Sequence, residues 1–263
     1  MRQIVKYIIA KIHSLFHPRI YKQMDAAQPI FILACGHSGT SVLLAILDSH
    51  SQIQAIGNET QILQFEQNSS IIRWKFHQYT RAFSAPRWVE KTPRHIHHIA
   101  KIWRTFPTAK VILLVRDGRD VACSIKKRYA DFEKGVQRWV NDNEAARPFW
   151  NHPNLYRLKL EDLQNAPEEN LQALCRFLDL PFEQKMLTYH KQKRFFYAQK
   201  IRYSEGDNGE TEHSQRRNWQ INQPLQRSKA RWTDEMNDTE KQIFKAQAQY
   251  LLEEFQYVRN QDW

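Results

Sequence analysis

A short apolar run that ends in a glycine-containing loop is the feature that most constrains the fold of this chain. Residues 29–34 read PIFILA, and the loop 35–41 follows directly. A strand that is apolar on both faces is typical of a parallel sheet covered by helices, because each face must be buried. Beyond the loop, apolar residues recur at helical spacing, at Val42, Leu43, Ile46 and Leu47. The segment therefore predicts a strand, a tight loop and a helix.

The same alternation recurs along the chain. We expect further strands at 87–90, 110–115 and 154–160, with helices between and after them. Strands that alternate with helices indicate βαβ units, and hence a central parallel sheet flanked by helices. The expected fold class is α/β, with three layers as in P-loop proteins. Ligands of such sheets bind at the carboxyl ends of the strands, which is where the polar motifs of this sequence stand.

The two ends of the chain depart from this alternation. Residues 1–28 predict a basic amphipathic helix and a linker, and residues 29–263 predict a single domain. The helix is expected to pack on the domain or on a partner subunit, with peripheral membrane contact as the less favoured alternative. After Thr188 the chain becomes basic and aromatic, and then polar with two glycines, which indicates a lid or helical excursion over the site. A last helix is expected from about residue 238 to 255.

The formal net charge of +11 and the isoelectric point near 9.6 indicate an anionic ligand or surface. Composition alone leaves nucleic acid, an acidic membrane face and a polyanionic cofactor open. Three cysteines, an odd number without paired spacing, favour a reducing compartment, and hence the cytoplasm, over a disulfide framework. We expect no signal peptide, because Lys6 and Lys11 interrupt the first apolar run, and no segment that spans a bilayer.

The loop after the first strand predicts an anion site. Gly36 and Gly39 allow a phosphate to approach the backbone closely, and the helix start adds unpaired amides and the positive end of a dipole. Thr40 and Ser41 add hydroxyl donors. The two glycines could instead serve only to cap the turn. A kinase or ATPase P-loop requires a lysine after the last glycine, where this chain has Thr40, and no aspartate for magnesium ends the strand 110–115.

A second anion site is predicted where the strand 110–115 ends. Arg116 closes this strand, and Ser124 and Arg128, four residues apart, lie on one face of the following helix. An arginine fork with a hydroxyl and a second arginine can bind a dianionic phosphate. Ion pairs among the arginines and aspartates of the RDGRD segment are the alternative, but such pairs give no reason for the hydroxyl.

Taken together, the motifs resemble those of the sulfotransferase superfamily, in particular a bacterial branch related to the tyrosylprotein and carbohydrate sulfotransferases. GHSGTS at 36–41 resembles the family's 5'-phosphosulfate loop, and LLVRDGRDVACSI at 113–125 resembles its 3'-phosphate motif. GNET at 57–60 resembles the segment with the catalytic glutamate, and VEKTP at 89–93 resembles the segment with a catalytic lysine. The resemblance covers residues 29–257, and the order and spacing of the motifs make it specific.

This resemblance implies an enzyme that transfers a sulfuryl group from 3'-phosphoadenosine 5'-phosphosulfate (PAPS) to an acceptor hydroxyl. Adenosine 3',5'-bisphosphate (PAP) would be the product, and no metal would be needed. Glu59 would be the general base, and Lys91 and His37 would stabilise the transition state. The residues that the resemblance assigns to cofactor binding are Gly36, His37, Ser38, Gly39, Thr40, Ser41, Arg116, Ser124, Arg128 and Arg231.

The chain departs from the family pattern at several places. His37 stands where lysine or arginine is usual, and it can replace them when protonated, a form that a neighbouring phosphate favours. Leu160 replaces a tyrosine of the family's YE-D/Q-L motif, and Arg231 stands at the place of a lysine near the cofactor. The family's transition-state serine has no aligned counterpart, since Ser214 is near but at a different spacing.

Other interpretations of these residues are open at the level of sequence. Glu59 could be an ordinary carboxylate at a helix start, and Lys91 a solvated lysine beside a turn. The histidines of segment 95–98 lack partners at ligand spacing, so we expect no metal site. The rival functions are a P-loop-type nucleotide kinase or hydrolase and a non-catalytic basic nucleic-acid-binding protein. No signature of a nucleic-acid-binding fold is present, so we expect no nucleic acid partner. Sugar, lipid, phenol, small-metabolite and peptide-tyrosine acceptors are all compatible with the sequence.

Overall fold

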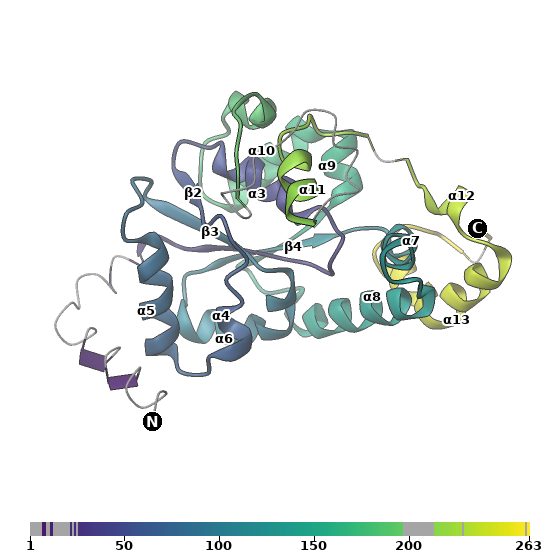
Figure 1. Cartoon of the computed structure of the whole chain (residues 1–263), viewed down its shortest axis with the longest axis horizontal. Coiled ribbons are helices and arrows are strands. Elements are labelled where there is room, and N and C mark those ends of the chain that lie inside the picture. The colour runs from purple at the N-terminus through teal and green to yellow at the C-terminus, as the bar shows by residue number, and fades with distance from the viewer. Residues whose placement is uncertain are drawn as a thin grey trace.

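The computed structural model describes residues 7–8, 11–12, 22, 24, 26–196, 213–227, 229–260 and 262–263. In this part of the chain the strands form one five-stranded sheet in which every neighbouring pair is parallel (Figure 1). They are β1 (Ile30–Leu33), β2 (Ile53–Ala55), β3 (Arg87–Lys91), β4 (Lys110–Val115) and β5 (Leu155–Lys159). Their order in the sheet is β2-β3-β1-β4-β5. The predicted α/β class and the parallel sheet are confirmed.

β1 occupies the centre of the sheet because it can be buried along its whole length. All four of its residues have no exposed surface. It pairs with β3 on one side, where Phe31 lies opposite Glu90, and with β4 on the other, where Ile32 lies opposite Ile112. The chain thus moves to one side of β1 for β2 and β3, and to the other side for β4 and β5. Such a switch of direction opens a crevice at the carboxyl ends of the strands, where ligands bind.

Helices cover both faces of the sheet. The α-helices are α3 (Thr40–Asp48), α4 (Ile62–Phe65), α5 (Ser69–Thr80), α6 (Ile99–Thr105), α7 (Gly118–Tyr129), α8 (Phe132–Ala146), α9 (Leu160–Asn165), α10 (Pro167–Phe177), α11 (His213–Gln220), α12 (Trp232–Glu235) and α13 (Asp238–Glu254). Short 3₁₀ helices are η1 (Pro93–His98), η2 (Arg147–Phe149), η3 (Gln184–Met186) and η4 (Tyr189–Lys191). In Figure 1, α3, α9 and α10 lie above the sheet, and α5, α6 and α8 lie below it.

The alternating side chains of β1 divide the core between these two faces. Phe31 and Leu33 belong to the cluster beneath the sheet, where Phe31 packs against Phe76, Trp88 and Phe106. The stacked rings of Phe76 and Trp88 have centroids 5.2 Å apart, and edge-to-face contacts join most of the remaining pairs. Offset and edge-to-face aromatic pairs favour one fixed arrangement. The side chains on the other face of β1, those of Ile30 and Ile32, pack with α3 and α10 in a second cluster. The strand ends are therefore held by a rigid core on both sides.

Several elements differ in detail from those predicted. The sequence pattern does not single out β2, which has three residues, or α8. The helix expected after β3 is divided into η1 and α6. Pro93 is tolerated at the start of η1 because the N–H that it lacks would have no partner there. The predicted end of the strand at residue 160 belongs instead to α9, whose first residue is Leu160.

Two predicted features fall mostly or wholly outside the described residues. The N-terminal helix and linker of residues 1–28 are described at a few positions only, and the polar segment 204–212 is not described. The division of the chain into residues 1–28 and a domain of residues 29–263 stays a prediction. Within the described ranges no helix is long and apolar enough to cross a bilayer. The cysteines are free and buried, at Cys35, Cys123 and Cys175.

Candidate active site

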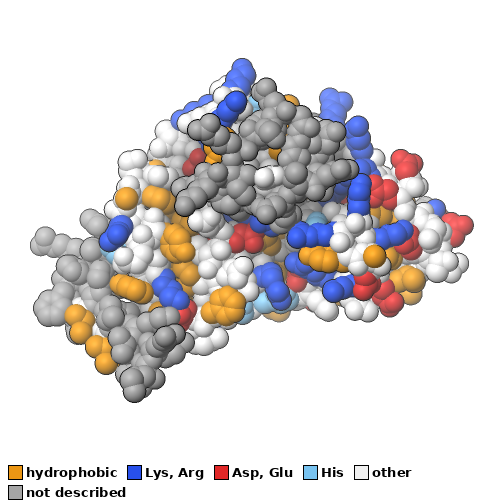
Figure 2. Space-filling view, viewed as in Figure 1, with side chains coloured by type: hydrophobic (Ala, Val, Ile, Leu, Met, Phe, Trp, Pro, Cys, Tyr) orange, Lys and Arg blue, Asp and Glu red, His pale blue; other side chains and the backbone are white. Residues whose placement is uncertain are grey.

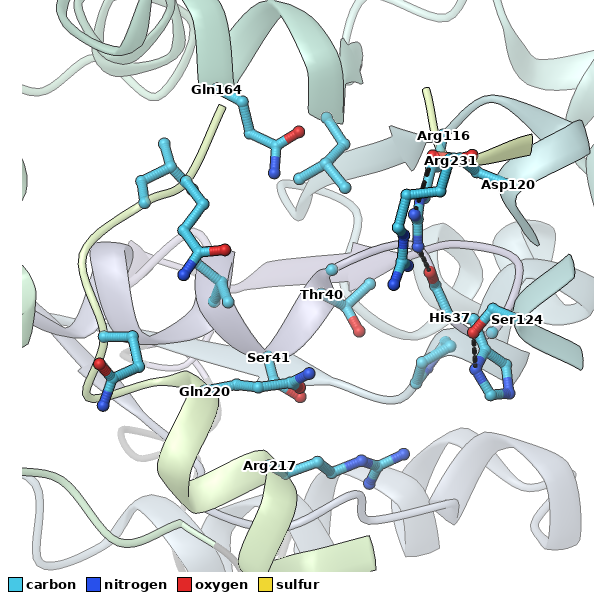
Figure 3. A pocket seen from close by; sticks show the side chains of 18 of the residues that line it. His37, Thr40, Ser41, Arg116, Asp120, Ser124, Gln164, Arg217, Gln220 and Arg231 are labelled. Carbon is cyan, nitrogen blue, oxygen red and sulfur yellow. Dashed lines mark hydrogen bonds and ion pairs between the residues drawn. The ribbon is translucent and has the colours of Figure 1, made fainter. Parts of the chain in front are cut away.

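A cavity of about 1090 Å³ lies at the carboxyl edge of the sheet (Figure 3). Its positive lining side chains are Arg94, Arg116, Lys127, Arg128, Arg138, Arg217, Arg227, Lys229 and Arg231. Its negative ones are Glu59, Asp120 and Glu235. Figure 2 shows Lys and Arg side chains gathered over α7 and α8, to the right of the grey region. A concave site with such an excess of positive charge raises the local concentration of anions.

The loop after β1 turns sharply at Gly39, the N-cap residue of α3. Its φ of 82° lies in the left-handed region, which glycine adopts without steric cost. A Cβ at this position would lie 2.9 Å from Leu160 Cδ1, so the absence of a side chain also lets Leu160 pack on the loop. His37 has a positive φ of 69°, which costs a non-glycine residue about 1 to 2 kcal/mol. Strain of this kind persists only where surrounding contacts hold the residue.

Two hydrogen bonds supply such contacts and join the loop to the segment after β4. Arg116 Nη1 donates to the carbonyl oxygen of His37 at 2.9 Å, and His37 Nδ1 lies 3.0 Å from Ser124 Oγ (Figure 3). Arg116 Nη2 binds Asp120 Oδ2 at 3.0 Å. The two segments predicted to bind anions therefore meet in one cavity, which Arg128 and Arg231 also line.

The ion pairs of the RDGRD segment are also present, but they leave Arg116 on the cavity wall. Arg119 Nη2 binds Asp117 Oδ2 at 2.7 Å, and its guanidinium lies 3.8 Å from the Trp232 ring centroid. Arg119 is only 4% exposed and does not line the cavity. Arg116 makes its pair with Asp120 and still faces the ligand space. The ion-pair alternative therefore accounts fully for Arg119, whereas the binding of a phosphate by Arg116 stays a prediction.

Glu59 faces the cavity with one carboxylate oxygen between two cations. Its Oε1 lies 2.6 Å from Lys91 Nζ and 2.8 Å from Arg217 Nη1. Lys91 is 1% exposed and lies behind Glu59, so it does not line the cavity. Arg217 comes from α11, and Figure 3 shows its side chain extending into the cavity. This arrangement keeps a carboxylate at the cavity wall in a fixed orientation.

Most of the predicted site residues line this one cavity, and two do not. Ser38 is 1% exposed, and its hydroxyl is buried without a hydrogen-bond partner among the described residues. Lys91 is the other exception. The predicted residues that line the cavity are Gly36, His37, Gly39, Thr40, Ser41, Glu59, Arg116, Ser124, Arg128 and Arg231.

Comparison with known proteins gives the family. A model described as the sulfotransferase family matches residues 63–184. A putative protein-tyrosine sulfotransferase of Caenorhabditis briggsae is 30% identical over 196 residues, which cover 62% of this chain and 70% of that protein. The chain belongs to the sulfotransferase family. The resemblance drawn from the motifs is confirmed.

Other relatives of this sulfotransferase family member differ from it more. An uncharacterized protein of Aquifex aeolicus is 27% identical over 235 residues, which cover 72% of this chain. The aligned part is only 31% of the length of that relative. Among solved structures, a mouse sulfotransferase complexed with PAP matches with a TM-score of 0.56 and 12% identity, over 90% of this chain and 93% of that one. At this identity the likeness shows a shared fold.

In this sulfotransferase family member, a buried carboxylate holds Thr60, the residue after Glu59, in place. Glu90 on β3 has no exposed surface and accepts hydrogen bonds from Thr60 N at 3.3 Å and Thr60 Oγ1 at 3.0 Å. His95 Nδ1 lies 3.1 Å from its other oxygen. Burial raises the pKa of Glu90, but His95 and the hydroxyl groups of Thr92 and Thr60 outweigh burial, so the pKa lies below its ordinary value. The ionised carboxylate thus anchors the residue next to Glu59.

Some cations of the cavity belong to none of the sequence motifs, and two of them come from helices that the motifs do not touch. They are Arg138 on α8 and Arg217 on α11. One signal could have located α8 in the sequence, namely apolar residues at helical spacing that the structure buries, at Phe132, Val136 and Trp139. No comparable pattern marks α11, whose sequence HSQRRNWQ is polar almost throughout.

Proposed function

We propose that this protein transfers a sulfuryl group from PAPS to an acceptor hydroxyl. The observation that carries the proposal is the contact between His37 and Ser124, which joins the loop after β1 to α7 within one basic cavity. PAPS has a phosphate at its 3' position and a phosphosulfate at its 5' position, so it requires two neighbouring anion sites. The shared fold with a mouse sulfotransferase complexed with PAP supports the choice of donor.

The two ends of the donor are assigned to the two segments that this contact joins. The amides of the loop, the start of α3 and the hydroxyl groups of Thr40 and Ser41 bind the 5'-phosphosulfate. The 3'-phosphate is bound by arginine forks and a hydroxyl group, which suit a dianion. These residues are Arg116, Ser124 and Arg128, with Arg231 beside them on the cavity wall.

Glu59 is the general base of the proposed reaction. It takes the proton of the acceptor hydroxyl as the acceptor oxygen bonds to sulfur and the bond from sulfur to the 5'-phosphate oxygen breaks. PAP leaves with the electron pair of the broken bond, and the proton stays on Glu59. Lys91 orients Glu59 through their 2.6 Å contact and adds positive charge, and His37 adds charge at the loop. The proposal assigns charge stabilisation to the chain's own cations rather than to a metal ion.

Ligand-induced stabilisation tests the choice of donor. PAP at about 100 times its Kd should raise the free energy of unfolding by about 2.7 kcal/mol. ATP with Mg²⁺ and a DNA oligomer should have a much smaller effect at equal concentration. The Arg116→Ala variant should lose most of the stabilisation by PAP while remaining folded. Arg104→Ala, which removes an exposed arginine outside the cavity, is the matched control and should keep it.

The rival functions give different outcomes in the same measurement. Stronger stabilisation by ATP with Mg²⁺ would favour a nucleotide kinase or hydrolase, and stronger stabilisation by DNA would favour a nucleic-acid-binding protein. Either result contradicts the proposal. Incubation with labelled PAPS and a panel of sugar, phenol, lipid and peptide-tyrosine acceptors then identifies the acceptor.

A further inference from the structure

α8 packs behind both of the segments that form the proposed donor site. The indole N–H of Trp139 donates to the carbonyl oxygen of Arg116 at 3.1 Å, and a Cβ at Gly118 would lie 2.5 Å from the Trp139 ring. Arg138, the residue before Trp139, lies against the loop after β1. A Cβ at Gly36 would lie 2.6 Å from Arg138 Nη2 and 3.1 Å from its Cζ. The guanidinium thus fills the space that a side chain at position 36 would take, and it lines the cavity.

A carboxylate one turn further along α8 forms an ion pair with this guanidinium. Asp142 Oδ2 lies 3.6 Å from Arg138 Nε, and Asp142 Oδ1 lies 2.7 Å from His97 Nε2. The Asp142 side chain is 7% exposed, whereas that of Arg138 is 34% exposed. Asp142 therefore attracts Arg138 electrostatically from the buried side, near Nε. The terminal nitrogens lie toward the loop and the cavity.

The loop itself has no permanent positive charge. Residues 36–41 include neither lysine nor arginine, and the one ionisable side chain, His37, is turned toward Ser124 on α7. Charge on the 5'-phosphate of PAP grows as the sulfuryl group leaves, and a donor already in place stabilises it best. A guanidinium stays charged at every pH at which proteins are folded, and its planar fork matches phosphate or sulfonate oxygens.

We infer that Arg138 binds the 5'-phosphosulfate of PAPS beside the loop and supplies the permanent cation of that end of the site. The inference rests on the proposed function. Arg138 is then a catalytic residue, since it contacts the transferred group and the leaving phosphate, and Asp142 positions it. A side chain at position 36 would displace the guanidinium from this place.

Three adenine nucleotides separate this role from a structural one. PAP and adenosine 5'-monophosphate carry a 5'-phosphate, whereas adenosine 3'-monophosphate does not. Arg138→Ala should weaken the binding of the first two by about 10- to 100-fold and leave that of the 3'-monophosphate unchanged. Arg116→Ala should show the opposite selectivity between the two monophosphates. Calorimetry measures PAP directly, and displacement of PAP measures the weaker monophosphates.

Two further variants keep the test decisive. Lys134→Ala removes an exposed lysine from the same helix and should bind all three nucleotides as the unmodified protein does. Arg138→Lys keeps the charge and should recover part of the affinity that Arg138→Ala loses. If Arg138→Ala folds poorly, the lysine variant provides the comparison, with a smaller loss of affinity confined to the two 5'-phosphates. An equal loss for all three nucleotides, or no loss, overturns the inference and leaves the proposed function intact. Failure of the unmodified protein to bind PAP overturns the proposed function instead.

Discussion

Glu59 reaches the cavity with one oxygen held by Lys91 at 2.6 Å and by Arg217 at 2.8 Å. We expect Glu59→Gln to lower kcat by about 10²- to 10⁴-fold, because an amide cannot take the proton of the acceptor hydroxyl. The Kd for PAP should change by less than about threefold, since Glu59 belongs to neither of the proposed phosphate sites. Steady-state rates with an identified acceptor and calorimetry with PAP measure the two quantities.

Glu235→Gln is the matched control for this prediction. Glu235 is an exposed carboxylate that also lines the cavity, and its replacement should change kcat by less than about twofold. A Glu59→Gln variant that binds PAP normally and keeps more than about a tenth of the activity would show that another group accepts the proton.

Single residues could be predicted where they are close together in the sequence. His37 and Gly39 follow a buried strand directly, and the four-residue spacing of Ser124 and Arg128 on a helix places both on one face. Arg138 could not be predicted in this way, because an arginine on the face of a helix is typical of a solvated surface. Its position against a loop about a hundred residues earlier follows only from the packing of α8.

At the scale of elements, the strands that stand out most clearly in the sequence are those buried on both faces. β1 and β4 consist almost entirely of apolar residues, because helices cover them above and below. β2 lies at the edge of the sheet and has only three residues, one of them Gln54, so no periodicity can reveal it. The 3₁₀ segment η1 was expected as part of a longer helix, since Pro93 marks a helix start but does not distinguish 3₁₀ turns from α-helical ones.

The last residue of η1, His98, leads us to expect that stability depends on pH. Burial and the nearby charge of Lys101 lower the pKa of His98 from 6.5 to about 4. Between these two values the unfolded chain binds a proton that the folded chain does not, so stability falls as the pH is lowered from 6.5 to 4. His98→Gln should reduce this loss by about 1 kcal/mol, a value that allows for solvent screening of a partly exposed side chain.

Urea unfolding of the unmodified protein and of His98→Gln, at several pH values, measures this effect. Above about pH 7.5 the two stability curves should run parallel, because the imidazole is neutral in both the folded and the unfolded chain. Equal losses of stability in the two proteins on going to about pH 4.5 would mean that His98 is protonated as readily in the folded chain as in the unfolded one.

At the scale of the whole molecule, the net charge of +11 and the basic cavity act in the same direction on an anionic donor. PAP carries about two negative charges on each phosphate at neutral pH. The Debye length falls from about 10 Å at 0.1 M salt to about 3 Å at 1 M, so distant charges are screened first and contacts in the cavity last. We expect the affinity for PAP to fall by about tenfold over this range, and the association rate to fall more steeply than the dissociation rate rises.

The variants of the donor site separate the two contributions to this salt dependence. Arg116→Ala and Arg138→Ala should bind PAP more weakly but keep most of the salt dependence of the association rate, because the steering field comes from all the basic residues together. Adenosine, which has no charge, should bind with an affinity nearly independent of salt. Stopped-flow and calorimetric measurements with both ligands at about 0.1 M and about 1 M salt provide the comparison. An affinity for PAP that does not change with salt would mean that the protein binds the adenosine and not the phosphates, which contradicts a site built from arginines at both ends.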